Sequence, residues 1–305
     1  MSLISLCFPV YQNEGALKML YDRTVAAMDS NFPHHDFEFI FVNDGSKDNS
    51  LNELIEIKRE SGDSRIKIIS FSRNFGQTAA ILAGWKYSQG DAVINLAADL
   101  QDPPEQCVPM IKEWENGNEI VISYRQSHGT SPINKITSRI FFKLLLPDSP
   151  PGGFDFVLLG RKALDVIVNL KAKNRFYHYD ILSIGFVIKF IPYQKQERTI
   201  GKSQYNFVKR LGAFAFAFVN VSYLPLRFMS LLGFVFSIAG FLYALAIIYA
   251  YFHNGTPFVG WAPIMIMLLI IGGLIMLMLG ILGEYIWRIF DEVKQRPNYI
   301  IDKIL

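Results

Sequence analysis

This sequence has few cysteines and a small net charge, and it lacks the common nucleotide-binding loop motifs. The two cysteines, Cys7 and Cys107, form no CxxC pair, so we expect reduced thiols in the core and no zinc site. The net charge of +3 is too small for the basic surface that nucleic acid requires. No GxGxxG follows a strand-like run and no GxxxxGKS/T occurs, which disfavours a Rossmann dehydrogenase and a P-loop ATPase.

Two long segments contain no Asp, Glu, Lys, Arg or His: Phe228–Phe252 and Trp261–Gly283. At about 1.5 Å per residue, each is long enough to cross the hydrocarbon core of a bilayer, and both are too long for a buried hairpin of a soluble domain. We therefore expect two transmembrane helices at 228–252 and 261–283. At the amino terminus, Leu3–Val10 is predicted to be a strand, because no basic segment or cleavage site marks a signal peptide.

Basic residues flank the two apolar segments and predict their orientation. Arg227 precedes the first, and Arg288 and Arg296 follow the second, whereas the connection between them has no Lys or Arg. By the positive-inside rule, both ends face the cytoplasm. The large amino-terminal part and a tail at 284–305 would then be cytoplasmic, in a multi-pass membrane protein.

Strand-like apolar runs alternate with helical patterns before these segments. The expected strands are Leu3–Val10, Phe37–Val42, Ile66–Phe71, Ala92–Leu96 and Glu119–Ser123, with a later one at Gly185–Pro192. Such alternation predicts an α/β domain with a mostly parallel sheet covered on both faces. In such sheets ligands bind beyond the carboxyl ends of the strands.

The most informative loop follows the fourth expected strand and reads NLAADLQDPPE, residues 95–105. Asp99 and Gln101 are two residues apart, so in an extended loop their side-chain oxygens point to the same side. Oxygens of this kind suit a hard cation carrying a diphosphate. Asp102 before two prolines reads as a helix N-cap. The alternative is that these aspartates only cap a turn.

Two further polar clusters follow the first and second strands, PVYQNE at 9–14 and NDGS at 43–46. Tyr11 is suited to stacking on a base. Glu14 and Asp44 are suited to accepting hydrogen bonds from uracil or ribose. Asn-Asp-Gly is also a common turn, so a purely structural role for Asp44 stays open.

In this order and spacing, PxxxNE, NDGS and ADLQDPPE resemble family-2 glycosyltransferases of the GT-A fold. The resemblance covers essentially the whole chain and is strongest to polyprenyl-phosphate glycosyltransferases, namely dolichyl-phosphate mannose synthases and bacterial bactoprenol glucosyltransferases. It implies Mg²⁺ or Mn²⁺ held by Asp99 and Gln101, with Ala97 standing where the family often has a first Asp. The nucleotide-binding residues that it implies are Pro9, Tyr11, Glu14, Asp44, Asn74, Gly76 and Asp99.

The middle of the chain adds candidates for binding an acceptor phosphate. Arg125 matches a family position that meets a phosphate. Residues 132–146 form a basic amphipathic pattern that includes Arg139, typical of a helix in a membrane interface, although a core-facing helix with solvated lysines has the same pattern. Asp155 stands near the family's GDF-like motif, but Phe154 interrupts the match. It is a candidate catalytic residue, with a turn residue as the alternative.

Arg198 and Lys202 lie in ERTIGKSQY, which resembles a family loop before the membrane segments. Four residues apart around Gly201, they are able to converge on phosphates, although such a pair is also common on solvated surfaces. We count both among the catalytic and acceptor-phosphate candidates, together with Asp99 and Asp155 for catalysis. Residues 209–227 are predicted to form a second interface helix.

The resulting prediction is a GT-A domain at 1–208 anchored in the bacterial inner membrane by a two-helix hairpin. It would transfer a hexose, glucose by resemblance, from a UDP-sugar to undecaprenyl phosphate with inversion, giving a lipid-linked sugar for O-antigen or other surface glycans. A processive polysaccharide synthase is disfavoured because no QxxRW occurs. A small transporter is disfavoured because the spans lack ionisable residues. The resemblance also implies a homotetramer.

Overall fold

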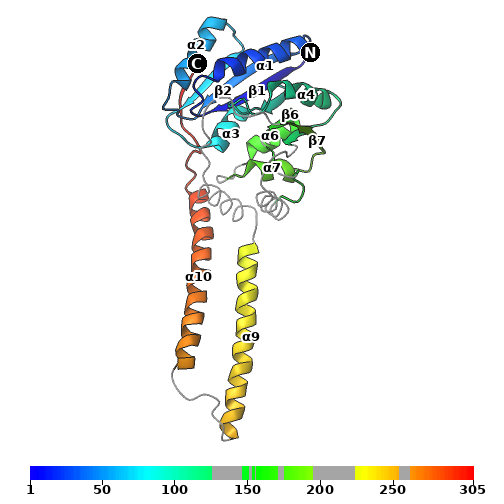
Figure 1. The fold of residues 1–305 in the computed structure, drawn as a ribbon. Helices are drawn as coiled ribbons and strands as arrows, with labels where there is room; N and C mark the ends of the chain where they lie inside the picture. Colours follow the sequence, from blue (N-terminus) through cyan, green and yellow to red (C-terminus); the bar gives the residue numbers. More distant parts are fainter. Residues whose placement is uncertain (126–145, 151–152, 155, 171–174, 195–223, 254–261) are drawn as a thin grey trace. The chain divides into compact units, whose positions relative to one another are not determined.

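The computed structural model describes residues 1–125, 146–150, 153–154, 156–170, 175–194, 224–253 and 262–305 (Figure 1). Contacts divide the chain into two compact units. The first is Met1–Phe214 together with Pro297–Leu305, and the second is Ala215–Arg296. Each unit is described separately below.

The first unit is built on an eight-stranded sheet with the order β7-β5-β6-β4-β1-β2-β3-β8. Its strands are β1 Leu3–Val10, β2 Asp36–Asn43, β3 Ile66–Phe71, β4 Ala92–Asn95, β5 Ile120–Arg125, β6 Phe156–Gly160, β7 Ile188–Tyr193 and β8 Ile301–Ile304. The strands β1 to β4 pair in parallel, and β7 pairs in parallel with β5. The antiparallel strands are β6, which pairs with β4 and β5, and β8, which pairs with β3. The predicted mostly parallel sheet is confirmed.

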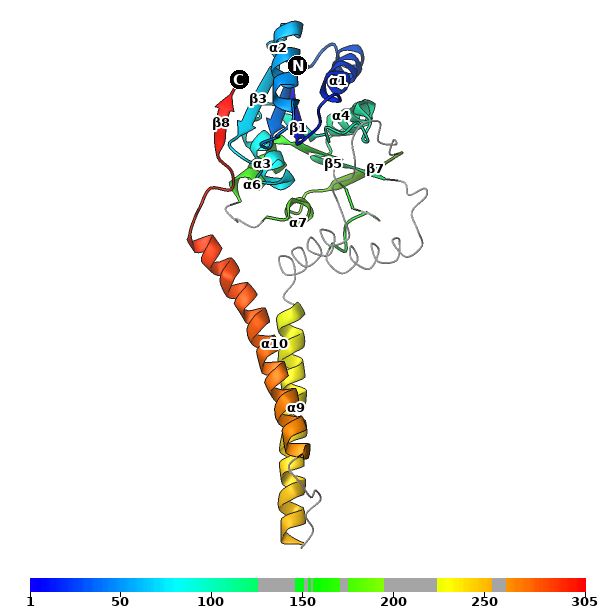
Figure 2. The same ribbon diagram turned by 60° about the vertical axis from the view of Figure 1, so that its left-hand side comes forward.

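Helices cover both faces of this sheet (Figures 1 and 2). They are α1 Leu17–Asn31, α2 Ser50–Ser61, α3 Gln77–Tyr87, η1 Pro104–Gln106, α4 Cys107–Glu115, α6 Arg161–Asn169 and α7 Tyr177–Ser183. Alternate residues of β1 enter two separate cores: Leu6 and Phe8 pack with α1, α2 and α4, whereas Cys7 packs with α3, α6 and α7. Burial on both faces explains the nearly continuous apolar strands. Cys7 and Cys107 are buried free thiols, as predicted, and burial raises the pKa of both.

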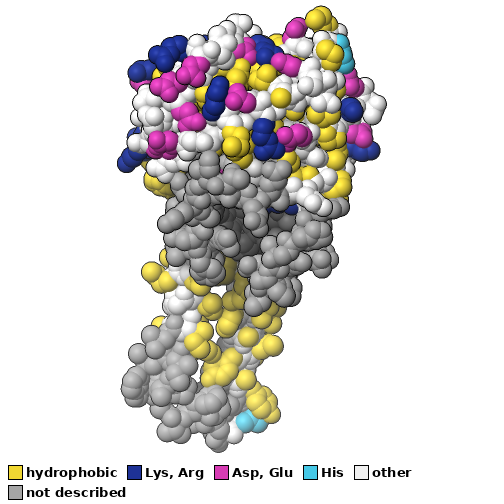
Figure 3. Space-filling view, turned by 45° about the horizontal axis from the view of Figure 1, so that its top comes forward, with side chains coloured by type: hydrophobic (Ala, Val, Ile, Leu, Met, Phe, Trp, Pro, Cys, Tyr) yellow, Lys and Arg dark blue, Asp and Glu magenta, His cyan; other side chains and the backbone are white. Residues whose placement is uncertain are grey.

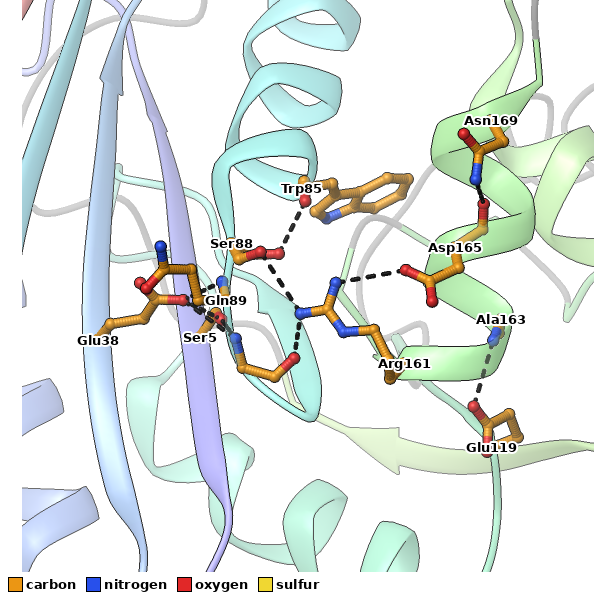
Figure 4. Close-up of polar contacts among 11 residues, drawn as sticks. Ser5, Glu38, Trp85, Ser88, Gln89, Glu119, Arg161, Ala163, Asp165 and Asn169 are labelled. Carbon is orange, nitrogen blue, oxygen red and sulfur yellow. Dashed lines mark hydrogen bonds and ion pairs between the residues drawn. The ribbon is translucent and has the colours of Figure 1, made fainter.

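A polar network closes the amino edge of the sheet, before β4 begins (Figure 4). Glu38 of β2 accepts hydrogen bonds from the Ser5 hydroxyl at 2.5 Å and from the Gln89 N–H at 2.6 Å. The Arg161 guanidinium donates to the carbonyl oxygens of Ser88, at 3.4 Å, and Gly90. These contacts join β1, β2, the turn before β4 and α6, so they fix the strand ends opposite to the predicted ligand edge.

The chain returns to the sheet after its apolar helices, which the sequence did not predict. Strand β8 extends the sheet beyond β3, and the Ser72 N–H donates to the Ile300 carbonyl oxygen at 3.0 Å. The Tyr299 ring stacks on Phe71, with centroids 4.9 Å apart and planes 10° apart. The residues expected only as a tail therefore cover an edge that would otherwise expose unpaired backbone groups.

The second unit contains two apolar helices, α9 Leu224–Phe252 and α10 Ala262–Val293. Both are long and apolar enough to cross a membrane, over Leu226–Tyr243 and Ile270–Val293, and almost none of either window is buried inside the protein. Figure 3 shows hydrophobic side chains gathered on these helices, whereas charged side chains of both signs mix on the first unit. Exposed apolar surface on this scale is typical of contact with a membrane.

We predict that Tyr299→Ala destabilises the first unit by about 1–3 kcal/mol, because the half-buried ring loses its stacking on Phe71 and β8 loses its anchor. Thermal unfolding of the full chain in detergent measures this. Asp302→Ala, at an exposed position of β8, is the matched control. Equal melting temperatures for the two variants would show that Tyr299 does not hold β8.

Candidate active site

The loops that follow β1 and β2 are joined by hydrogen bonds. The Asp44 N–H donates to the Val10 carbonyl oxygen at 2.9 Å, and the Gln12 N–H donates to the Ser46 hydroxyl at 3.1 Å. Loop 95–101 begins beside them, because the Leu96 N–H donates to the Cys7 carbonyl oxygen at 3.0 Å. The polar clusters at 9–14, 43–46 and 95–105 therefore lie along one edge of the sheet, where open α/β sheets bind ligands.

Two carboxylates hold the first two loops: Glu53, which sequence reasoning missed, and Glu14, a predicted nucleotide-binding residue. Glu53 of α2 accepts hydrogen bonds from the N–H groups of Gly15, at 2.7 Å, and Leu17, at 3.1 Å, and so caps the start of α1 from another helix. The Glu14 carboxylate accepts from the Asn49 N–H at 3.2 Å. The only sequence signal for Glu53 is its place in the first turn of a predicted helix, where an acidic residue is ordinary.

Asp44 joins the second loop to the segment before α3. Its buried carboxylate accepts from the Phe75 N–H at 2.6 Å and from the Gly76 N–H at 2.9 Å. Burial raises the pKa of this carboxyl, and the two N–H groups oppose the rise. Asp44 therefore has a structural role, which its sequence context had left open as an alternative. The contact also brings Asp44 next to the segment that holds Gly76 and the exposed Asn74, and all three are predicted nucleotide-binding residues.

Gly45 makes this contact possible. It has φ +60°, and a Cβ at this position would lie 2.3 Å from the Arg73 carbonyl carbon and 2.6 Å from the Asn74 nitrogen. Any side chain would therefore push the two loops apart.

We predict that Gly45→Ala destabilises the protein by about 2 kcal/mol more than Gly62→Ala and weakens binding of UDP, the nucleotide that the sequence resemblance implies. Gly62 is the matched control because it has the same φ of +60°, but a Cβ added there would meet nothing within 4 Å, so it carries only the backbone penalty. Thermal unfolding and UDP titration of both variants test this. Similar losses in the two would mean that the loop contact does not matter.

Burial alternates along the loop after β4. Leu100 and Asp102 are buried, whereas Asp99 and Gln101 are only partly buried. Leu100 has φ +59°, and the Asp99 carboxylate accepts from the Gln101 N–H at 3.2 Å. A carboxylate and an amide oxygen therefore share the accessible side of the loop, and this donor set fits a hard divalent cation.

Asp102 is not a helix N-cap, and that prediction is wrong. The helical turn η1 begins at Pro104 with Pro103 at its cap position and no side-chain cap bond. The buried Asp102 carboxylate instead accepts a hydrogen bond from the Tyr193 hydroxyl at the end of β7. Sequence reasoning missed Tyr193 because its partner is 91 residues away and no local spacing marks the pair.

Arg125 ends β5, directly opposite Tyr193 of β7 in the strand register, and its charge acts on the Tyr193 hydroxyl. Burial raises the pKa of the Tyr193 hydroxyl, the Asp102 carboxylate raises it further, and Arg125 opposes the rise. The other predicted site residues, Arg139, Asp155, Arg198 and Lys202, lie outside the described residues, as do 132–145 and 209–223 of the two expected interface helices.

A second polar cluster lies at the amino edge, away from these loops. Glu115 contacts Nε2 of His35 at 3.0 Å and Nε2 of His34 at 3.4 Å. Burial acts to raise the pKa of Glu115, but hydrogen bonds from His35 and His34 outweigh it and hold the pKa below its ordinary value. His35 Nδ1 accepts the Ser2 N–H at 3.4 Å, so its Nε2 carries a proton. In the contact between His35 and Glu115 the imidazole is therefore the donor and the carboxylate the acceptor.

A family model described as glycosyl transferase family 2 matches residues 5–178. The chain belongs to this family. The family match and the mostly parallel mixed sheet together confirm the predictions of a GT-A fold and of a glycosyltransferase. The family model ends before the apolar helices of the second unit.

Similar proteins of known sequence span nearly the whole glycosyltransferase. An uncharacterized glycosyltransferase of Bacillus subtilis, YkcC, is 39% identical over 98% of this chain and 93% of its own. A prophage-derived bactoprenol glucosyl transferase of Shigella flexneri is 33% identical over 98% of this chain and 97% of its own. The similarity therefore includes the two apolar helices.

Two solved structures are similar to the larger part of the chain. One is mannosyl-3-phosphoglycerate synthase from Rubrobacter xylanophilus, with a TM-score of 0.49, 16% identity and 74% of each chain covered. The other is glucosyl-3-phosphoglycerate synthase from Mycobacterium tuberculosis in complex with Mn²⁺ and UDP-glucose. It has a TM-score of 0.47 and 16% identity, with 70% of this chain and 75% of that chain covered.

Proposed function

We propose that this glycosyltransferase transfers glucose from UDP-glucose to undecaprenyl phosphate, with inversion, at the cytoplasmic face of a bacterial inner membrane. The observation that carries the proposal is the full-length similarity to a bactoprenol glucosyl transferase, which extends through both apolar helices. A membrane-anchored enzyme is suited to an acceptor whose lipid chain stays in the bilayer. The lipid-linked sugar would serve surface-glycan modification.

The nucleotide would bind at the joined loops beyond β1 and β2. Tyr11 would stack on the base, and Glu14 and Asp44 would accept from uracil or ribose, with Pro9 and Asn74 completing the pocket. The hydrogen bonds that connect these loops support the assignment, because they fix the loops before the nucleotide arrives. A panel of UDP- and GDP-sugars tests the donor: turnover confined to another nucleotide sugar would overturn UDP-glucose.

The divalent cation, Mg²⁺ or Mn²⁺, would be held by Asp99 and Gln101 together with the phosphates of the nucleotide. Its chemistry there would be to neutralise the diphosphate as it leaves. The oxygen donors on the accessible side of loop 98–101 support this site, and Ala97 offers no further ligand.

Asp99→Asn should lower turnover at least about 100-fold, because it removes the charge that holds the cation, while the amide oxygen still accepts the Gln101 N–H. Stability should change by less than about 0.5 kcal/mol. Asp36→Asn, an exposed carboxylate at the amino edge, is the control. The assay follows UDP release with Mg²⁺, with Mn²⁺ or with EDTA. Undiminished turnover of wild type in EDTA would refute the metal site.

The acceptor phosphate needs no general base. A phosphomonoester has a second pKa near ~6, so it is mostly dianionic at neutral pH and its oxygen is already nucleophilic. That oxygen forms the bond to the anomeric carbon while the bond to UDP breaks on the opposite face, and UDP leaves with the electron pair. The protein then has to position two anions and offset their charge, for which Arg125, Arg139, Arg198 and Lys202 are the proposed groups. Asp155 would orient the sugar or one of these cations.

Replacing both Arg198 and Lys202 by Ala should lower turnover by at least about 100-fold with little change in thermal stability, because both cations would act on phosphate charge. Lys189→Ala is the control, since Lys189 is a half-exposed cation that pairs with Glu113 at 3.6 Å. Turnover of the double variant close to that of the control would demote the 198–202 loop to a surface turn.

A processive polysaccharide synthase is the second candidate. Product analysis separates the two, because a single transfer to undecaprenyl phosphate gives one lipid-linked hexose and no polymer. The proposal also includes a homotetramer, which the mass of the detergent-solubilised enzyme tests directly.

A further inference from the structure

Tyr193 lies where three segments of the first unit meet. It is the last residue of β7, it is 6% exposed, and its hydroxyl donates to the carboxylate of Asp102, which is 2% exposed. Arg125 is its register partner on β5, and the charge of Arg125 acts on the hydroxyl. Phe156 of β6 holds the ring edge-on, with centroids 5.9 Å apart.

The Tyr193 hydroxyl donates to the Asp102 carboxylate, and the charge of Arg125 acts on it from the neighbouring strand. A phenol donates a single hydrogen bond, and Tyr193 gives it to Asp102. A buried carboxylate is costly without such a donor. Tyr193 therefore lies between Asp102 and Arg125 and is able to set their positions relative to each other.

Asp102 directly follows Gln101, one of the two proposed metal ligands. The start of the loop is fixed by the Leu96 N–H on the Cys7 carbonyl oxygen, and the end by Asp102 on Tyr193. Between these anchors Leu100 is buried with φ +59°, which turns the flanking side chains of Asp99 and Gln101 to the accessible side. Losing the Tyr193 anchor would leave the second half of the loop free to shift.

We propose that Tyr193 is a positioning residue that couples the proposed metal loop, Asp99–Gln101, to Arg125. It thereby fixes the position of the cation site relative to the acceptor-phosphate site. The inference rests on the proposed function of both sites. Tyr193 touches neither reactant in this proposal, so it acts only through Asp102 and Arg125. Removing its hydroxyl should weaken the binding of both the cation and the acceptor phosphate, which the loss of a purely structural tyrosine would not do.

The chain contains a matched control of the same chemistry. The Tyr21 hydroxyl donates to the Asp63 carboxylate at 2.6 Å, between α1 and the turn before β3, away from the metal loop. Tyr21→Phe and Tyr193→Phe each remove one hydroxyl from a tyrosine–aspartate pair. A general loss of stability therefore affects both variants, whereas a loss of positioning affects only Tyr193→Phe.

The experiment uses the full-length enzyme in detergent. The Mn²⁺ concentration that gives half-maximal UDP binding is measured by calorimetry, and the KM for undecaprenyl phosphate is measured with UDP-glucose at saturating Mn²⁺. For Tyr193→Phe we expect both values to rise about tenfold, because the buried Asp102 carboxylate loses its donor and the hydroxyl beside Arg125 is gone. For Tyr21→Phe we expect less than a twofold change in either.

Two variants of Asp102, Asp102→Asn and Asp102→Leu, provide a second test if Tyr193→Phe does not fold. In Asp102→Asn the amide oxygen still accepts from the Tyr193 hydroxyl, so the half-maximal Mn²⁺ concentration should stay within about threefold of wild type, whereas Asp102→Leu should raise it about tenfold. Equal Mn²⁺ responses of Asp102→Leu and wild type would overturn the inference, as would a wild-type response of folded Tyr193→Phe. A wild-type enzyme that binds UDP and turns over without any divalent cation would instead refute the proposed metal site itself.

Discussion

The buried carboxylate of Asp44 is the interaction on which the ligand edge depends. It accepts the N–H groups of Phe75 and Gly76, which hold the start of α3 against the loop after β2. Burial of an ionised carboxylate is expensive, and two backbone donors at short distance offset that cost. Because Gly45 leaves no space between the two loops, their separation is set by backbone contact rather than by side-chain packing.

The same arrangement recurs along this edge of the sheet. Glu53 accepts backbone N–H groups from the loop after β1, Glu14 accepts from the loop after β2, and Asp102 accepts from β7. Each carboxylate is satisfied by a neighbouring loop or strand, so the loops are connected before any ligand binds. Asp99 is placed differently, since it is only partly buried and its carboxylate accepts an N–H from its own loop. Such preorganisation lowers the cost of ordering a site around a ligand.

Sequence patterns predicted what depends on local composition. Apolar runs identified β1 to β5, and alternation placed Asp99 and Gln101 on one side of their loop. The patterns failed where a strand or a side chain pairs with a residue far away in the sequence. Strand β8 is short and half polar, and only its pairing with β3 makes it a strand. Asp102 reads as a cap because two prolines follow it, but Tyr193, 91 residues later, takes its carboxylate.

The antiparallel strand β6 explains how residues from the middle of the chain come close to loops that precede them in the sequence. It runs opposite to β4, so its first residues pair with the last residues of β4, with Val157 opposite Asn95. The chain therefore enters β6 at the edge where the loop after β4 begins. On its other side β6 pairs with β5, whose end carries Arg125. Inserting one reversed strand thus places the start of β6, Phe156, between the end of β4, which leads into a candidate cation site, and the end of β5, which carries a candidate phosphate-binding residue.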